Sequence, residues 1–141
     1  MSDITNALGI RKFLASLLAN GSSAYLFATL HGTGGSALSS TTDAYASSGI
    51  GELATGNGYT AGGKTCGTIT VDSNTNIDTP DVVWTASGGN IGPASYIAFW
   101  INSTNSITGA HLVCVKDYSG SPQTASTGNT ITGTITDLIG F

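Results

Sequence analysis

The sequence predicts a mainly β protein, an antiparallel β-sandwich or jelly roll with an N-terminal α-helix. Two observations lead to this fold class. From residue 24 onward, short apolar, β-branched and aromatic runs alternate with clusters of Gly, Pro and Asn. Before that point, apolar residues recur at helical spacing. The 141 residues suit one domain, so we predict a single domain over residues 1–141.

The first element is a helix over about residues 3–20. Asp3 or Ser2 can cap its start, and Asn20-Gly21 supplies the left-handed residue that ends it. Because β signals follow almost exclusively, the apolar stripe of this helix must dock on a sheet or on another subunit. The stripe includes Ile4, Ala7, Leu8, Leu14, Ala15, Leu17 and Leu18.

The next two segments differ sharply in character. Residues 24–31 are a nearly continuous apolar run, which predicts a central strand. Residues 32–64 contain Gly pairs and a Ser/Thr run and predict a long loop with little regular structure. A loop of this length in a compact domain usually serves function or an interface.

The β body comprises residues 24–31 and 65–138. In the segment 94–102, alternation places Tyr96, Ala98 and Trp100 on one face and Ile97, Phe99 and Ile101 on the other. Both faces are apolar, so this strand should lie between two covering layers. Turn residues divide the rest of the body into strands near 65–71, 81–86, 94–102, 109–117 and 129–138.

The composition argues against catalysis and for association. Only four basic and eight acidic residues are present, with two His and two Cys, so few titratable groups are available for chemistry. A surface of Ser, Thr, Asn and Gly favours packing against other subunits, because charged residues are depleted at interface cores. A secreted domain with a Thr-rich β exterior is the alternative. The acidic balance excludes nucleic acid as a partner, which would require clustered Lys and Arg.

The candidate chemical residues are few and scattered. Cys66 and Cys114 are too far apart for a metal knuckle or a CxxC redox motif, so we expect two buried thiols; a disulfide between neighbouring strands is the first alternative, and paired metal ligation is a remote one. His31 and His111 have no acidic cluster around them, so each should be a half-buried imidazole with local hydrogen bonds.

Two motifs resemble ligand sites without fulfilling their requirements. Residues 58–65 match the phosphate-loop spacing, but the residues that follow are β-branched and contain Gly67, so no helix should begin there. Asp72, Asp78 and Asp81 could line a calcium site, but their spacing matches no EF-hand and such residues are common in turns. We therefore predict no catalytic, cofactor-binding or metal-binding residues, and no cofactor.

Residues 11–24 mimic a secretory signal, with two basic residues before a short apolar run. The run is too short and carries Ser16, so a signal peptide is not expected. No segment approaches the ~20 apolar residues that a membrane span needs. No membrane partner is therefore expected.

The order of several short motifs resembles a family of small bacteriophage structural proteins. In this order come Asn6-Ala7-Leu8 on the helix, the strand 25–30, Glu52-Leu53 before Gly56-Asn57-Gly58-Tyr59, Val82-Val83-Trp84-Thr85, the strand 96–101 and the segment 128–136. Residues 32–51 depart from the family pattern, in which a short Thr/Pro-rich segment is common.

The resemblance implies a non-enzymatic virion protein, made in the bacterial host cytoplasm. Head decoration or cement proteins of this kind bind the major capsid protein and their own copies, and a trimer is expected. The alternative is a tail- or fibre-associated adhesin that binds a host surface glycan; a small hydrolase on a β-sandwich is a more distant class. The expected interface residues are Leu8, Leu14, Leu17, Leu18, Tyr45 and Tyr59.

Overall fold

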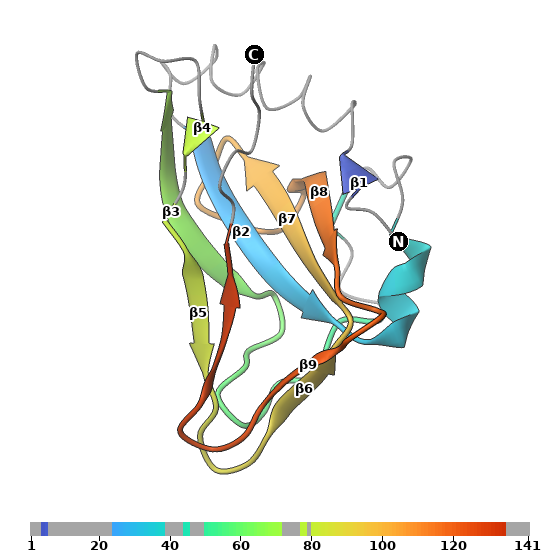
Figure 1. Cartoon of the computed structure of the whole chain (residues 1–141). Coiled ribbons are helices and arrows are strands. Elements are labelled where there is room, and N and C mark those ends of the chain that lie inside the picture. The colour runs from blue at the N-terminus through green and yellow to red at the C-terminus, as the bar shows by residue number, and fades with distance from the viewer. Residues whose placement is uncertain are drawn as a thin grey trace.

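The computed structural model describes residues 4–5, 24–38, 44–45, 50–71, 77–78 and 80–134. These residues form a mainly β structure in which the paired strands run antiparallel (Figure 1). In chain order the elements are β1 (Ile4–Thr5), β2 (Ala24–His31), the 3-10 helix η1 (Thr33–Ala37), β3 (Lys64–Val71), β4 (Ile77–Asp78), β5 (Val82–Thr85), β6 (Ile91–Ala94), β7 (Tyr96–Asn102), β8 (His111–Asp117), β9 (Gln123–Ala125) and β10 (Thr130–Gly133).

The largest sheet has six strands in the order β1-β8-β7-β2-β3-β4. Its centre is the pair β2 and β7, which is in continuous register from Tyr25 opposite Asn102 to His31 opposite Tyr96. An apolar run is stabilised most when both of its faces are covered, and seven of the eight residues from Ala24 to His31 are buried in this position. The prediction of a central strand over residues 24–31 is confirmed.

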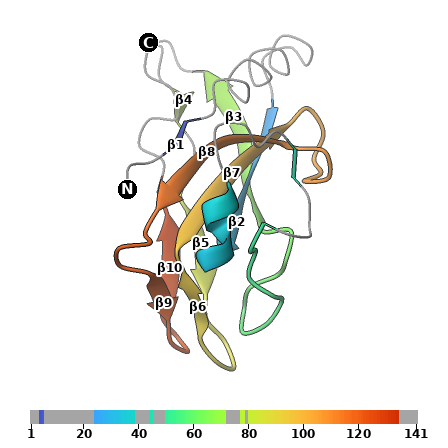
Figure 2. The same cartoon turned by 90° about the vertical axis from the view of Figure 1, so that its right-hand side faces the viewer.

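The two faces of β7 pack into two separate apolar clusters. Ile97, Phe99 and Ile101 belong to the first cluster, and Tyr96, Ala98 and Trp100 belong to the second. This is the division that alternation predicts for a strand covered on both sides. Figure 2 shows η1 in front of β7, on the side where Leu38 joins the second cluster.

The first cluster is closed by two smaller sheets, β10-β5 and β6-β9. In β5, the inward residues Val82 and Trp84 are buried while Val83 and Thr85 are exposed, as expected for a strand with one face on a core. Ile131 of β10 and Ile91 of β6 complete the contact with the large sheet. The large sheet is therefore covered by β pairs on one face and by η1 and loop residues on the other.

The structure corrects several expected boundaries. The segment 94–102 is divided between β6 and β7, because Ser95 leaves the ladder, and β8 begins at His111. The last described strand ends at Gly133, before the expected end at residue 138; residues 135–138 lie outside the described part of the chain. β6 and β9 were not expected as separate strands. Both are short and flanked by turns, so neither carries a clear period-2 signal.

The predicted N-terminal helix requires a correction at its start. Ile4 and Thr5 form β1 and pair with Val115 and Cys114 of β8, so these two residues belong to the sheet. Their pairing with a distant strand overrides the local helical spacing. The other residues of the expected helix lie outside the described ranges.

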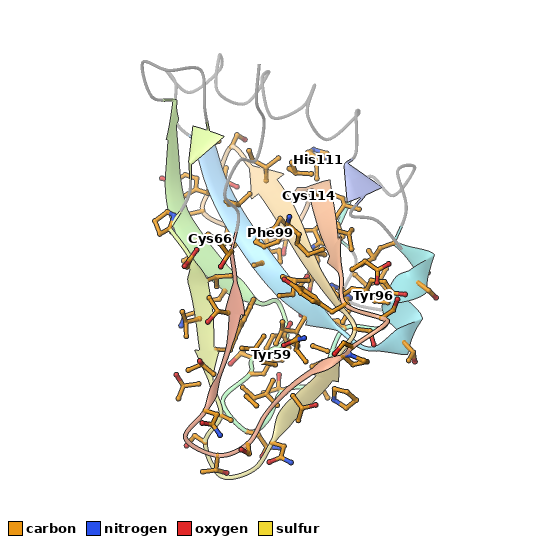
Figure 3. The ribbon with its side chains drawn as sticks, in the orientation of Figure 1. Tyr59, Cys66, Tyr96, Phe99, His111 and Cys114 are labelled. Carbon is orange, nitrogen blue, oxygen red and sulfur yellow. The ribbon has the colours of Figure 1, made fainter. Side chains whose placement is uncertain are left out.

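Cys66 and Cys114 are both buried and are not joined by a disulfide, so the prediction of buried thiols is confirmed and the disulfide alternative is wrong. They lie in the first cluster, on β3 and β8, and are 7% and 8% exposed. Burial raises the pKa of the Cys66 thiol to about 12, which keeps it protonated near neutral pH. Figure 3 shows both side chains among the strands of the core.

Candidate functional site

The long loop between β2 and β3 returns to the sheet and is fixed there by backbone hydrogen bonds. Gly32 N donates to Gly51 O, and Leu53 N donates to Leu30 O, each at 2.9 Å. Glu52, between them, forms a β-bridge with His31. These contacts place the Glu52 side chain at the end of the central strand. Within the described parts of 32–63, no strand longer than an isolated bridge is present, as the sequence predicts.

The Glu52 carboxylate accepts hydrogen bonds from three parts of the loop. Tyr45 Oη donates to Oε2 at 2.7 Å, Tyr59 Oη donates to Oε1 at 2.6 Å, and Gly62 N donates to Oε1 at 2.7 Å. Tyr59 Oη also accepts a hydrogen bond from Leu30 N at 3.1 Å. Bonds to an ionised acceptor are stronger than neutral ones. Glu52 therefore joins the loop to itself and, through Tyr59, to β2.

The chemistry of this cluster favours a structural role for its tyrosines. Burial raises the pKa of Tyr59 well above its usual value, and the hydrogen bond to Glu52 and the negative charge of Glu52 raise it further. The same causes, with burial again the largest, raise the pKa of Tyr45. A raised pKa opposes formation of a phenolate, so neither hydroxyl is prepared to act as a nucleophile or a general base.

A second polar chain lies beneath the loop, inside the sheet. Trp100 Nε1, which can only donate, donates to Thr29 Oγ1 at 2.8 Å. Thr29 Oγ1 lies 2.6 Å from His31 Nε2, and His31 Nδ1 lies 2.9 Å from Ile50 O. Because a carbonyl can only accept, Nδ1 carries the proton and the Thr29 hydroxyl donates to Nε2.

His31 is therefore a neutral imidazole with both nitrogens occupied. It is fully buried rather than half-buried, which corrects the expectation. Its hydrogen bond to Thr29 is local, as expected, but its bond to Ile50 comes from the distant loop. Burial lowers the pKa of His31, and this outweighs the opposing effects of the bond to Ile50 and of the charge on Glu52. His111 is half-buried, as expected.

A tight hairpin forms the tip of the loop. Gly56 and Tyr59 exchange both backbone hydrogen bonds at 2.9 Å, so Asn57 and Gly58 are the two central residues. Their φ values of 56° and 97° are both positive, as a type I′ turn requires, and Asn-Gly is the preferred pair for that turn. A Cβ at Gly58 would lie 2.2 Å from Thr85 O, so only glycine allows this approach to β5.

The hairpin tip is tied to the loop 86–92, which is in turn tied to residues 126–129. Asn57 O accepts a hydrogen bond from Ser87 N, and Asn57 Nδ2 donates to Asn90 O, both at 2.9 Å. Thr127 Oγ1 donates to Gly89 O at 3.3 Å. Residues 53–60, 86–92 and 126–129 contain no Asp, Glu, Lys or Arg, and we refer to them as the uncharged end. Figure 1 shows these loops at the end of the molecule opposite β4.

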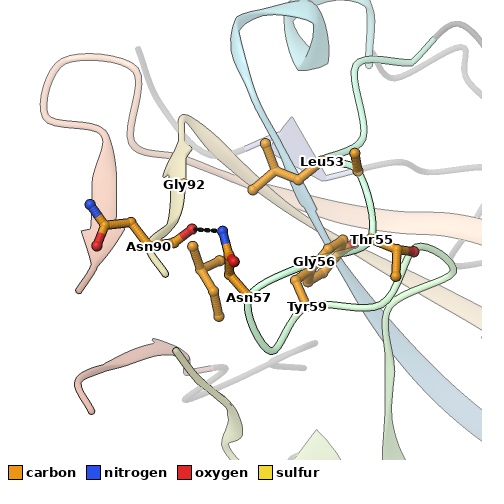
Figure 4. A pocket seen from close by; sticks show the side chains of 9 residues that line it. Leu53, Thr55, Gly56, Asn57, Tyr59, Asn90 and Gly92 are labelled. Carbon is orange, nitrogen blue, oxygen red and sulfur yellow. Dashed lines mark hydrogen bonds between the residues drawn. The ribbon is translucent and has the colours of Figure 1, made fainter. Parts of the chain in front are cut away.

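A pocket of about 260 Å³ lies within the uncharged end, between residues 53–59 and residues 90–92 (Figure 4). Leu53 and Ala54 supply apolar surface, Thr55 and Asn57 supply hydroxyl and amide groups, and the greater part of the exposed lining is polar. The volume lies just below the range of about 300–1,000 Å³ that is usual for small-molecule pockets.

A second hollow of about 300 Å³ lies on the other side of the hairpin, lined by Gly58, Thr60, Gly63, Lys64, Trp84 and Thr85. Its lining includes Gly58, Gly63 and Lys64, three of the four residues that match the phosphate-loop spacing. Lys64 begins β3 rather than a helix, and its Nζ donates to Val83 O at 2.9 Å. The strand expected after this motif is confirmed, so the helix N-terminus that a phosphate loop needs is replaced by a strand.

The expected interface residues fall in different surroundings. Tyr59 is only 2% exposed and its ring packs beside Trp84 in the first cluster, so in the single chain it is part of the core. Tyr45 is half-buried and lies edge-to-face on Trp100, with ring centroids 5.4 Å apart. Leu8, Leu14, Leu17 and Leu18 lie outside the described residues.

No pattern in the sequence indicates that Glu52 and its partners form a cluster. A local signal existed only for the hairpin, in Asn57-Gly58 between Gly56 and Tyr59. Among the described ranges, no three His, Cys, Asp or Glu gather as a metal site. Within the same ranges, no helix has the length and hydropathy needed to cross a membrane.

Comparison with family models, curated proteins and solved structures finds no match for this chain. The resemblance to bacteriophage structural proteins therefore remains a prediction from the order of short motifs.

Proposed function

We propose that the protein is a non-enzymatic structural protein of a bacteriophage virion, most simply a head decoration protein that binds the shell and its own copies. The observation that carries this proposal is the uncharged end, a set of three cross-linked loops without a charged side chain. Such a surface can be buried against a partner without desolvating ions, and it loses little conformational entropy on binding because it is already fixed.

The polar clusters support the same function. The hydrogen bonds of Glu52, Tyr45, Tyr59 and His31 link the loop to the sheet and so maintain the shape of the surface. We also propose that the two layers around the first cluster form a β-sandwich, in which β10-β5 and β6-β9 are the second layer. This architecture is a common scaffold for binding loops at its ends.

The pocket beside Asn57 favours a second candidate, a tail- or fibre-associated protein that binds a host surface glycan. Its lining combines uncharged polar groups with apolar side chains, which suits a neutral ligand.

Immunogold electron microscopy of purified phage particles that carry the protein tests both candidates. A decoration protein should be labelled in many copies over the head, and an adhesin in few copies at the tail. Antibody absorbed with the purified protein is the control. Sedimentation velocity of the isolated protein should show an oligomer, with a trimer expected. A monomer at micromolar concentration together with unlabelled particles would refute the virion proposal.

A further inference from the structure

We propose that the pocket between residues 53–59 and 90–92 binds a neutral sugar that carries an acetamido group. This inference specifies the ligand class for the second candidate function, but it concerns a binding site and does not depend on where the protein is located. Four features of the pocket lead to it.

The first feature is that the pocket walls are already fixed. The type I′ hairpin holds Asn57, and the bond from Asn57 Nδ2 to Asn90 O links the two walls at 2.9 Å. A Cβ at Gly89 would lie 2.5 Å from Asn57 Oδ1, so the loop that carries Asn90 packs directly on the Asn57 side chain. A site that is already ordered avoids much of the entropy loss on binding.

The second feature is the absence of charge in the lining, which contains neither acidic nor basic residues. The charged residues on either side along the chain are engaged elsewhere. The Glu52 carboxylate accepts bonds from Tyr45, Tyr59 and Gly62, and Lys64 Nζ donates to Val83 O. The pocket therefore offers no charged group to an ion, and a neutral ligand suits it better.

The third feature is the separation of apolar and polar groups. Figure 4 shows the Leu53 side chain reaching from one wall toward the strand that carries Gly92. Leu53 and Ala54 provide a surface for a methyl group. Asn57 and Thr55 provide amide and hydroxyl groups that can exchange hydrogen bonds with ring hydroxyls.

The fourth feature is the presence of Gly56 in the lining. Without a side chain, its peptide groups can approach a ligand closely. A Cβ at Gly56 would meet no atom within 4 Å, which shows open space beside its backbone. An acetamido group has the matching parts, a methyl for the apolar surface and an amide that can pair with peptide groups.

The test is a titration of the ¹⁵N-labelled full chain with N-acetylglucosamine, followed by ¹H–¹⁵N NMR. Glucose is the matched ligand without the acetamido group. We expect shifts confined to residues 53–57 and 90–92 and a dissociation constant of about 1 mM, which is a weak single-site affinity. Glucose should bind at least about tenfold more weakly, a difference of about 1.4 kcal/mol.

Two variants test the lining, and one is a control. Asn57→Gly removes the amide but allows the positive φ, and Leu53→Ala removes the apolar surface; each should weaken binding at least about fivefold, a change of about 1 kcal/mol. Lys64→Ala, which alters the other hollow, should leave the affinity unchanged. Dispersed spectra show that each variant is folded.

Three results would overturn the proposal: no shifts at tens of millimolar N-acetylglucosamine, equal binding of glucose, or unchanged affinity in a folded Leu53→Ala protein. Because this titration reports only on the pocket, its failure leaves the particle-labelling result for the virion proposal intact.

Discussion

Replacing Glu52 with Ala tests whether its carboxylate fixes the long loop. The change removes the acceptor of three hydrogen bonds, from Tyr45, Tyr59 and Gly62. After this change, water can take the place of the carboxylate least easily at the Tyr59 hydroxyl, because Tyr59 is only 2% exposed. Its bond to a charged acceptor should contribute about 1.5–3 kcal/mol.

The other two bonds should contribute less, because Tyr45 and Gly62 are half-buried and water can take the place of Glu52. With about 0.5–1 kcal/mol for each, the free energy of unfolding should fall by about 2.5–5 kcal/mol in the Glu52→Ala protein. This is a large part of the total stability of a typical domain, about 5–15 kcal/mol.

Urea unfolding followed by tryptophan fluorescence measures this change. Trp84 and Trp100 report on the cluster directly, since Tyr59 packs beside one and Tyr45 beside the other. Glu52→Gln is the matched control. Its carbonyl can accept from Tyr59 and Gly62 while its amide donates to a reoriented Tyr45 hydroxyl, so the loss should be about 1 kcal/mol. A loss below about 1 kcal/mol in Glu52→Ala would refute the reasoning.

The remaining predictions concern pH, one surface residue and the N-terminal stripe. His31 has a lowered pKa when folded, so acidification below about 6.5 protonates the unfolded chain first and stability should fall, by up to about 1.4 kcal/mol per pH unit. His31→Gln should flatten this dependence below about pH 6.5, and an unchanged pH dependence of the unfolding free energy in urea titrations would disprove it. Lys64→Ala should change the unfolding free energy by less than about 0.5 kcal/mol, because the side chain is exposed; a loss above about 1 kcal/mol would show that its bond to Val83 holds the edge of β5. A protein with Leu14→Asp and Leu18→Asp should keep its β-rich circular dichroism but lose self-association in sedimentation, because a buried unpaired charge is disfavoured. Complete unfolding would place the stripe in the core instead, and normal assembly would exclude it from the interface.

Some parts of the fold were predictable because their cause lies within a few residues. The alternation from Tyr96 to Ile101 fixes which side chains share a face, since successive residues of a strand point to opposite sides. The strand after Lys64 follows from its β-branched residues. Asn-Gly is likewise the residue pair that favours a type I′ turn, and Asn57 and Gly58 adopt the two positive φ values that this turn requires.

The N-terminal residues show where local spacing was insufficient. Ile4 matches the helical period, yet it pairs with Val115 in the sheet. A pairing partner more than a hundred positions away leaves no trace in the local pattern, and tertiary hydrogen bonds override a weak helical preference.

The candidate site was decided by tertiary structure alone. Tyr45, Glu52 and Tyr59 lie in a loop without periodicity, so nothing local shows that both hydroxyls reach one carboxylate. The same is true of Trp100, Thr29 and His31, which β2 and β7 bring together by their register. By itself the sequence determined the longer strands and the Asn57-Gly58 turn, because these depend on neighbouring residues. The polar clusters and the pocket depend on how the chain returns to the sheet, and that geometry exists only after folding.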